Sequence, residues 1–108
     1  MATSMEFINY VCEQLSGIGN ISYKKMFGEY MVYLNEKPVI IVCDDTAYVK
    51  KLDCIQSFME NADTGFPYNG AKEHYILDID NPDFSKEVIK EIEKVTPLPK
   101  RKKDNSKK

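Results

Sequence analysis

The sequence predicts an α+β protein of two layers, in which helices cover one face of an antiparallel sheet. Apolar residues recur at helical spacing near both ends of the chain. Between residues 21 and 50, four short segments rich in β-branched and aromatic residues follow one another. Their connections are only a few residues long, which favours antiparallel hairpins because a parallel crossover needs a dozen residues or more. The expected order is α-β-β-β-β-α-β-α.

The first helix is expected to begin at Thr3, which forms a capping-box pattern with Glu6. Gly17 supplies a natural end to this helix. The apolar residues at helical spacing between them are Phe7, Ile8, Val11, Cys12 and Leu15.

The four strands are expected in "ISYKKMF" (21–27), "YMVYL" (30–34), "VIIVC" (39–43) and "AYVK" (47–50). Turn residues separate them, namely Gly28-Glu29, Asn35-Glu36-Lys37-Pro38 and Asp44-Asp45-Thr46. Side chains alternate between the two faces of a strand, so Lys24 and Lys25 should lie on opposite faces and cannot form a single phosphate clamp.

The second half of the chain is expected to add a helix, a strand and a last helix. The carboxylate of Asp53 can cap the first of these helices, and residues 61–72 are dense in turn formers. "HYILDI" (74–79) alternates like a strand, and Asn81-Pro82 opens the last helix. The residues expected to face the core from the two helices are Ile55, Phe58, Met59, Ala62, Phe84, Val88, Ile92 and Val95.

Composition indicates one folded domain, because the 108 residues are 43% hydrophobic and 30% charged. No apolar run approaches the ~20 residues that span a membrane, and the N-terminus lacks the pattern of a signal peptide. Cys12, Cys43 and Cys54 are odd in number and show no CxxC spacing, as expected of reduced thiols. We therefore expect a cytoplasmic protein without membrane contact, metal or cofactor.

Charge divides the chain into two parts. Residues 1–96 carry nine Lys/Arg against sixteen Asp/Glu, a net charge of −7, whereas residues 97–108 carry six against one, a net charge of +5. We expect a folded domain over residues 1–99 and a disordered basic tail over residues 100–108, which either raises solubility or contacts DNA. The candidate nucleic-acid contacts are Lys100, Arg101, Lys102, Lys103, Lys107 and Lys108.

The stretch "SYKKMFGEYMVY" (22–33) mixes lysines with aromatic residues, as RNA-binding surfaces do. It does not fit the RNP1 signature, because Met26 stands where a glycine is needed and Glu29 stands where an aromatic residue should stack. A hairpin that turns at Gly28, where positive φ has no steric cost, explains these residues better.

The same region resembles the TfoX N-terminal domain family. The block "YKKMFGEYMVYLNEKPVIIVCDDTAYVK" carries the family's basic residue, Met-Phe-Gly, acidic pair and Tyr-x-Lys ending, and "FPYNGAKEHYILDIDNP" resembles a downstream block. The chain departs from the family where Lys25 replaces an arginine and where Glu29 and Met31 replace small residues. The motif residues are Lys25, Met26, Phe27, Gly28, Tyr30, Tyr33, Asp44, Asp45, Tyr48, Lys50, Gly70 and Lys72.

This resemblance implies a fold similar to secretion-chaperone-like α+β domains, and it implies no catalytic residues. The two-domain members, called TfoX or Sxy, regulate competence and transcription together with the cyclic-AMP receptor protein, and they carry an additional C-terminal helical domain. Because this chain ends before such a domain, we expect a stand-alone N-terminal domain. We expect it to be a regulatory or protein-interaction module, whose partner is a transcription regulator, the transcription machinery or a second copy.

Other candidate sites are weaker. Asp44-Asp45 fits turn chemistry better than metal binding, and His74 is expected to be an exposed or edge residue rather than a base. Cys54, near Lys50 and Lys51, allows a thiol sensor or a small enzyme as a third hypothesis, after DNA binding by the tail. The tyrosines expected to form an interaction patch on one sheet face are Tyr30, Tyr33 and Tyr48.

Overall fold

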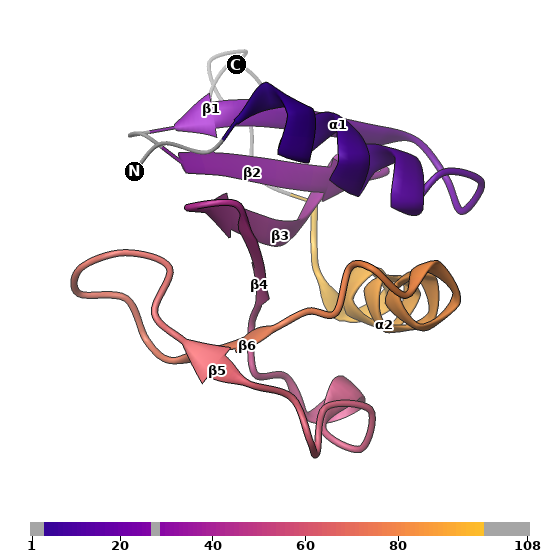
Figure 1. Cartoon of the computed structure of the whole chain (residues 1–108). Helices are drawn as coiled ribbons and strands as arrows, with labels where there is room; N and C mark the ends of the chain where they lie inside the picture. The colour runs from indigo at the N-terminus through magenta and orange to yellow at the C-terminus, as the bar shows by residue number, and fades with distance from the viewer. Residues whose placement is uncertain (1–3, 27–28, 99–108) are drawn as a thin grey trace, which may run out of the picture.

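A computed structural model of the chain describes residues 4–26 and 29–98 (Figure 1). The elements follow the order α1 (Met5–Gln14), β1 (Ile21–Met26), β2 (Glu29–Leu34), β3 (Lys37–Cys43), β4 (Thr46–Val49), the 3-10 helix η1 (Asp53–Ile55), β5 (Thr64–Gly65), β6 (His74–Ile76) and α2 (Pro82–Val95). In this part of the chain the strands form one antiparallel sheet in the order β1-β2-β3-β4-β6-β5. The predicted α+β class is confirmed.

Helix α1 begins at a serine that also ties the helix to the sheet. The Ser4 hydroxyl accepts a hydrogen bond from the Phe7 N–H at 3.1 Å, and the Ser4 N–H donates to the Asp45 carboxylate at 2.9 Å. Thr3, the expected cap, lies outside the described residues. The predicted apolar stripe is confirmed, since its central residues are fully buried in the core, namely Ile8, Val11 and Leu15.

Two tight turns set the pairing of the central strands. Asn35 and Glu36 join β2 to β3 with φ of 53° and 70°, and Asp44 and Asp45 join β3 to β4 with φ of 53° and 54°. Two consecutive residues with positive φ give a hairpin turn whose twist matches that of the flanking strands, and Asn and Asp tolerate this conformation better than most residues. The acidic pair therefore acts as a turn, as predicted.

The helix expected from Asp53 is replaced by a single 3-10 turn. Leu52 precedes this turn and provides no side-chain cap, while Asp53 lies inside it. A short helix without a cap leaves its first backbone N–H groups unpaired, which disfavours its extension. Residues 56–61 continue as turns that bury Met59 but leave Phe58 exposed, contrary to the expected inward stripe.

Strand β5 was not predicted, and it changes the environment of β6. Gly65 of β5 pairs with His74, while β4 pairs with the other side of β6. Strand β6 is thus flanked on both sides, and it is shorter than expected because Leu77 already lies beyond its end. A strand of two residues shows no periodicity, so hydrophobic patterning could not reveal it.

Helix α2 begins where the sequence predicts. The Asn81 side chain accepts a hydrogen bond from the Phe84 N–H at 3.3 Å, and Pro82 occupies the first helical turn. Val95, expected in the buried stripe, is 54% exposed because the helix ends there. The buried residues of α2 are Ser85, Val88, Ile89 and Ile92.

The two helices take different places relative to the sheet. In Figure 1, α1 lies across β1 and β2, whereas α2 lies below α1. Helix α2 contacts β3 and η1. None of the helices in the described ranges is long and apolar enough to cross a membrane.

Candidate functional site

The sheet face turned away from α1 carries a continuous row of side chains. Cross-strand pairs join one residue from each of five neighbouring strands, namely Lys24, Met31, Ile41, Tyr48 and Ile76. Residues directly opposite each other in an antiparallel sheet project from the same face. Tyr33 follows Met31 by two positions in β2 and shares this face. We call the surface formed by Lys24, Met31, Tyr33, Ile41, Tyr48 and Ile76 the open face.

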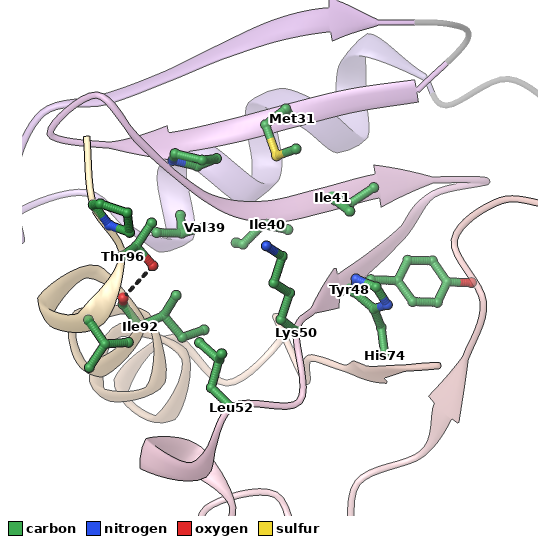
Figure 2. Close-up of a pocket in the computed structure, with 13 residues that line it drawn as sticks. Met31, Val39, Ile40, Ile41, Tyr48, Lys50, Leu52, His74, Ile92 and Thr96 are labelled. Carbon is green, nitrogen blue, oxygen red and sulfur yellow. Dashed lines mark hydrogen bonds between the residues drawn. The ribbon is translucent and has the colours of Figure 1, made fainter. Parts of the chain in front are cut away.

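A pocket of about 210 Å³ lies on this face, between the sheet and the C-terminal end of α2 (Figure 2). Its apolar lining includes Met31, Ile41, Tyr48, Leu52, Ile92 and Val95. Thr96 also lines the pocket, but its hydroxyl already donates to the Ile92 carbonyl at 2.7 Å. The Tyr48 hydroxyl points away from the other lining residues in Figure 2, whereas Lys50 and His74 add polar groups to the lining.

His74 is buried in the wall of this pocket, with 6% of the residue exposed. Its Nδ1 lies 2.7 Å from the Lys72 carbonyl oxygen, and because a carbonyl only accepts, Nδ1 carries the proton of this bond. Nε2 is buried and has no hydrogen-bond partner within the part of the chain that the structure describes. The expectation of an exposed or edge histidine is wrong, because β5 pairs along the outer side of β6.

Lys50 stands beside His74 as a result of the register of β4 and β6. The last pair of β4 and β6 joins Val49 to Tyr75, and Lys50 directly follows β4, so the chain brings Lys50 next to His74, the first residue of β6. Figure 2 shows the Lys50 side chain extending across the pocket. Its ammonium group makes no hydrogen bond or ion pair with another described residue. Among the described residues, Lys50 is therefore a cation without a partner over a largely apolar pocket.

The tyrosines that we expected to cluster are divided between the two faces. Tyr33 and Tyr48 belong to the open face. Tyr30 pairs with Lys25 and lies on the α1 side, where its hydroxyl donates to the Met5 Sδ at 3.4 Å. The expected cluster is wrong for Tyr30 because residues an odd number of positions apart in one strand project from opposite faces.

The three cysteines are partly buried free thiols. Cys54 Sγ donates to the Glu91 carbonyl of α2 at 3.7 Å. Burial raises the pKa of the Cys12 thiol, and burial followed by the nearby charge of Asp44 raises the pKa of Cys43. A raised pKa reduces the thiolate fraction, so Cys12 and Cys43 are poorly placed for thiol chemistry. Within residues 4–26 and 29–98, no group of three His, Cys, Asp or Glu residues could hold a metal ion.

Comparison with known proteins identifies the family. The sequence model of the TfoX N-terminal domain matches residues 13–81, more than half of the chain. The chain belongs to the TfoX N-terminal domain family. It is also similar to an uncharacterised 12.7 kDa protein in the trpE 5′ region of Spirochaeta aurantia, with 36% identity over 78 residues, which cover 72% of this chain and 68% of that protein.

The TfoX N-terminal domain match spans β1 to β6 and contains the strand residues of the pocket. Tyr48 and Lys50, from the Tyr-x-Lys ending of the family block, both line the pocket. Lys72 fixes the His74 ring through its carbonyl. Gly70, with φ of +87°, adopts a backbone conformation that L side chains rarely take, just before Lys72.

The other motif residues that the structure describes do not line the pocket. Lys25 is exposed on β1, Met26 ends that strand, and Asp44-Asp45 forms the β3–β4 turn. Phe27, Gly28 and the tail cations of residues 100–108 lie outside the described residues. The roles suggested for these residues therefore stay predictions, as does the division into a domain and a tail.

Sequence reasoning missed the pocket itself. The alternation of side chains along a strand could have predicted part of the pocket lining, because it places Met31 on the same face as Tyr33 and Tyr48 on the same face as Lys50. The wall that α2 contributes could not be found in this way, because Ile92 and Val95 are far from β3 in sequence and meet it only through the tertiary fold.

Proposed function

We propose that this chain is a non-enzymatic regulatory module that binds a protein partner through its open face. Membership in the TfoX N-terminal domain family supports a regulatory role, because the resemblance described above implies that the two-domain members regulate transcription. The observation that carries the proposal is the open face, where Met31, Tyr33, Ile41 and Tyr48 are only partly buried. Partly exposed apolar and aromatic side chains in a continuous row are typical of interaction surfaces.

The charges on this face indicate the chemistry of the partner. Lys24 lies 5.8 Å from the centre of the Tyr33 ring, and Lys50 extends across the pocket. The open face thus offers two ammonium groups beside an apolar centre. We infer a partner surface with an apolar centre and neighbouring carboxylates, because complementary charge speeds and orients association. A second copy of this chain fits less well, since it would bring four ammonium groups to one interface.

Photocrosslinking in cells tests this proposal. We would place p-benzoylphenylalanine at Tyr33 on the open face and, as a control, at Lys90 on the exposed side of α2. We expect the probe at Tyr33 to capture a protein that then binds the purified chain. Lys24→Glu should weaken that binding about tenfold, whereas Lys90→Glu, the same charge change on α2, should leave it unchanged.

Two outcomes would overturn the proposal. The first is capture of the same proteins from both positions, because this would show that the open face selects no partner. The second is a purified complex that tolerates Lys24→Glu but is lost when residues 100–108 are deleted. That result would favour the alternative of a DNA-binding accessory protein that acts through its basic tail.

A further inference from the structure

We infer that the pocket on the open face is a binding site for a small apolar carboxylate, such as an aromatic or branched-chain acid. The inference rests on the size of the pocket, on its apolar lining and on two polar groups that have no partner within residues 4–26 and 29–98, Lys50 Nζ and His74 Nε2. It concerns the pocket alone and holds whether or not the surrounding face binds a protein.

The volume of the pocket limits the size of its ligand. An apolar cavity of ~150 Å³ holds one benzene molecule, which has about six heavy atoms. In proportion, the 210 Å³ found here holds about eight or nine heavy atoms. This is below the range of roughly 300–1,000 Å³ typical of sites for drug-sized ligands. A single ring or a short branched chain would contact the side chains of Met31, Ile41, Leu52 and Ile92.

The two unpartnered polar groups define the charge of the ligand. A carboxylate pairs with the Lys50 ammonium, and it can also accept a hydrogen bond from His74 Nε2 when both ring nitrogens carry a proton, since Nδ1–H is already held by the Lys72 carbonyl. Both polar groups then have a partner, and the buried nitrogen is no longer unsatisfied. A neutral amide of the same shape leaves the Lys50 charge unpaired.

The ligand reaches Nε2 only if a side chain moves, because this atom is closed to solvent in the structure. Lys50 is exposed, extends across the pocket and is held by no described residue (Figure 2). Its side chain can therefore change rotamer while its ammonium group stays beside the ligand carboxylate. Tyr48 is more constrained, because its ring packs closely over Gly65. A Cβ added to this glycine would lie only 3.2 Å from the ring. The pocket therefore combines a packed wall with one movable side chain.

The test uses benzoate and benzamide, two probes of nearly the same shape that differ in charge. Each is titrated into the ¹⁵N-labelled full chain while the backbone amide signals are followed by NMR. We expect benzoate to cause saturable shifts at Ile41, Tyr48, Leu52 and Thr96, with a Kd of about 1 mM, as the small number of heavy atoms suggests. Benzamide should bind about fivefold more weakly, because a partly exposed ion pair contributes a factor of that order.

Adjacent lysines provide matched variants. Lys50→Met should weaken benzoate binding about fivefold and leave benzamide binding unchanged. Lys51→Met removes the same charge one position later, where the side chain instead binds the Glu73 carboxylate at 2.7 Å, so it should leave benzoate binding unchanged. His74→Leu should also weaken benzoate binding, because it removes the ring nitrogen that the carboxylate would contact.

Each contrary result overturns the inference in a different way. Equal affinities for benzoate and benzamide would show that the pocket does not select carboxylates. Equal losses in Lys50→Met and Lys51→Met would reduce the effect to general charge attraction. If neither benzoate nor 4-methylpentanoate shifts the pocket amides at about 20 mM, a ceiling well above the expected Kd, the pocket is not a site for small apolar acids.

Discussion

Replacing His74 by leucine tests whether the buried imidazole destabilises the fold. His74 is 6% exposed, and its Nε2 has no partner among the described residues. Removing an unsatisfied buried polar atom gains about 1–3 kcal/mol, whereas losing the bond from Nδ1 to the Lys72 carbonyl costs about 0.5–1.5 kcal/mol. Leucine fills a similar volume without a polar atom. We therefore expect His74→Leu to raise the free energy of unfolding by about 1 kcal/mol.

Urea unfolding followed by circular dichroism measures this change. With a slope of about 1 kcal/mol per molar urea, the midpoint should rise by about 1 M while the slope itself stays the same. His74→Ala is the matched control, since it removes the same nitrogen but leaves a cavity. It should be about 2 kcal/mol less stable than His74→Leu.

A His74→Leu protein that is clearly less stable than the wild type would refute this reasoning, because Nε2 would then have a partner in the folded state. The expected gain in stability is accompanied by the expected loss of benzoate binding. Such opposite effects are common at binding sites, where a polar group retained for a ligand lowers the stability of the unliganded protein.

Contacts elsewhere lead to three further predictions. Hydrogen bonds from Lys51, the larger cause, and from Thr64, both at 2.7 Å, lower the pKa of Glu73 below its usual 4.5. The ionised Glu73 carboxylate therefore stabilises the fold above pH 4.5, and this stabilisation is lost as the pH falls through the lowered pKa. The Tm difference between the wild type and Glu73→Gln should accordingly be largest at neutral pH and shrink on acidification; a difference that stays constant would contradict this. A Cβ at Gly19 would lie 2.7 Å from Leu34 Cδ1, so Gly19→Ala should cost about 1–3 kcal/mol in urea unfolding, and wild-type stability would show that this turn is packed less closely. Because residues 1–96 carry a net charge of −7, we expect fluorescence anisotropy to show no binding of duplex DNA at physiological salt. The DNA-binding alternative would be favoured by binding that disappears without residues 100–108 and whose logarithmic affinity falls with the logarithm of salt concentration at a slope of up to about −5.

Local chemistry made much of the fold predictable from the sequence. The turns at Asn35-Glu36 and Asp44-Asp45 and the helix start at Asn81-Pro82 each depend on neighbouring residues, and each lies within the predicted segment. The turns are shorter than predicted, because β3 already begins at Lys37 and β4 at Thr46. The antiparallel pairing of β2, β3 and β4 follows from the two turns, because turn geometry sets the pairing of a hairpin.

The parts that were not predicted depend on contacts between distant residues. Strand β5 is too short to show a pattern, and without it His74 would lie on an edge strand. The short segment after Leu52 resembles a helix in its spacing but lacks the cap that would extend it. The pocket forms only where the fold brings Lys50, His74 and the C-terminal end of α2 together, and no local sequence pattern predicts that arrangement.

The most direct test of the proposed function is whether the open face carries regulatory activity in the cell. Transcripts would be compared in a strain that lacks the protein and in the same strain supplied with the wild type, Lys24→Glu, Lys90→Glu or residues 1–99. The account predicts that Lys24→Glu reproduces the loss of the protein, whereas Lys90→Glu and residues 1–99 restore the wild-type transcripts. Restoration by Lys24→Glu together with failure of residues 1–99 would contradict it and assign the activity to the basic tail.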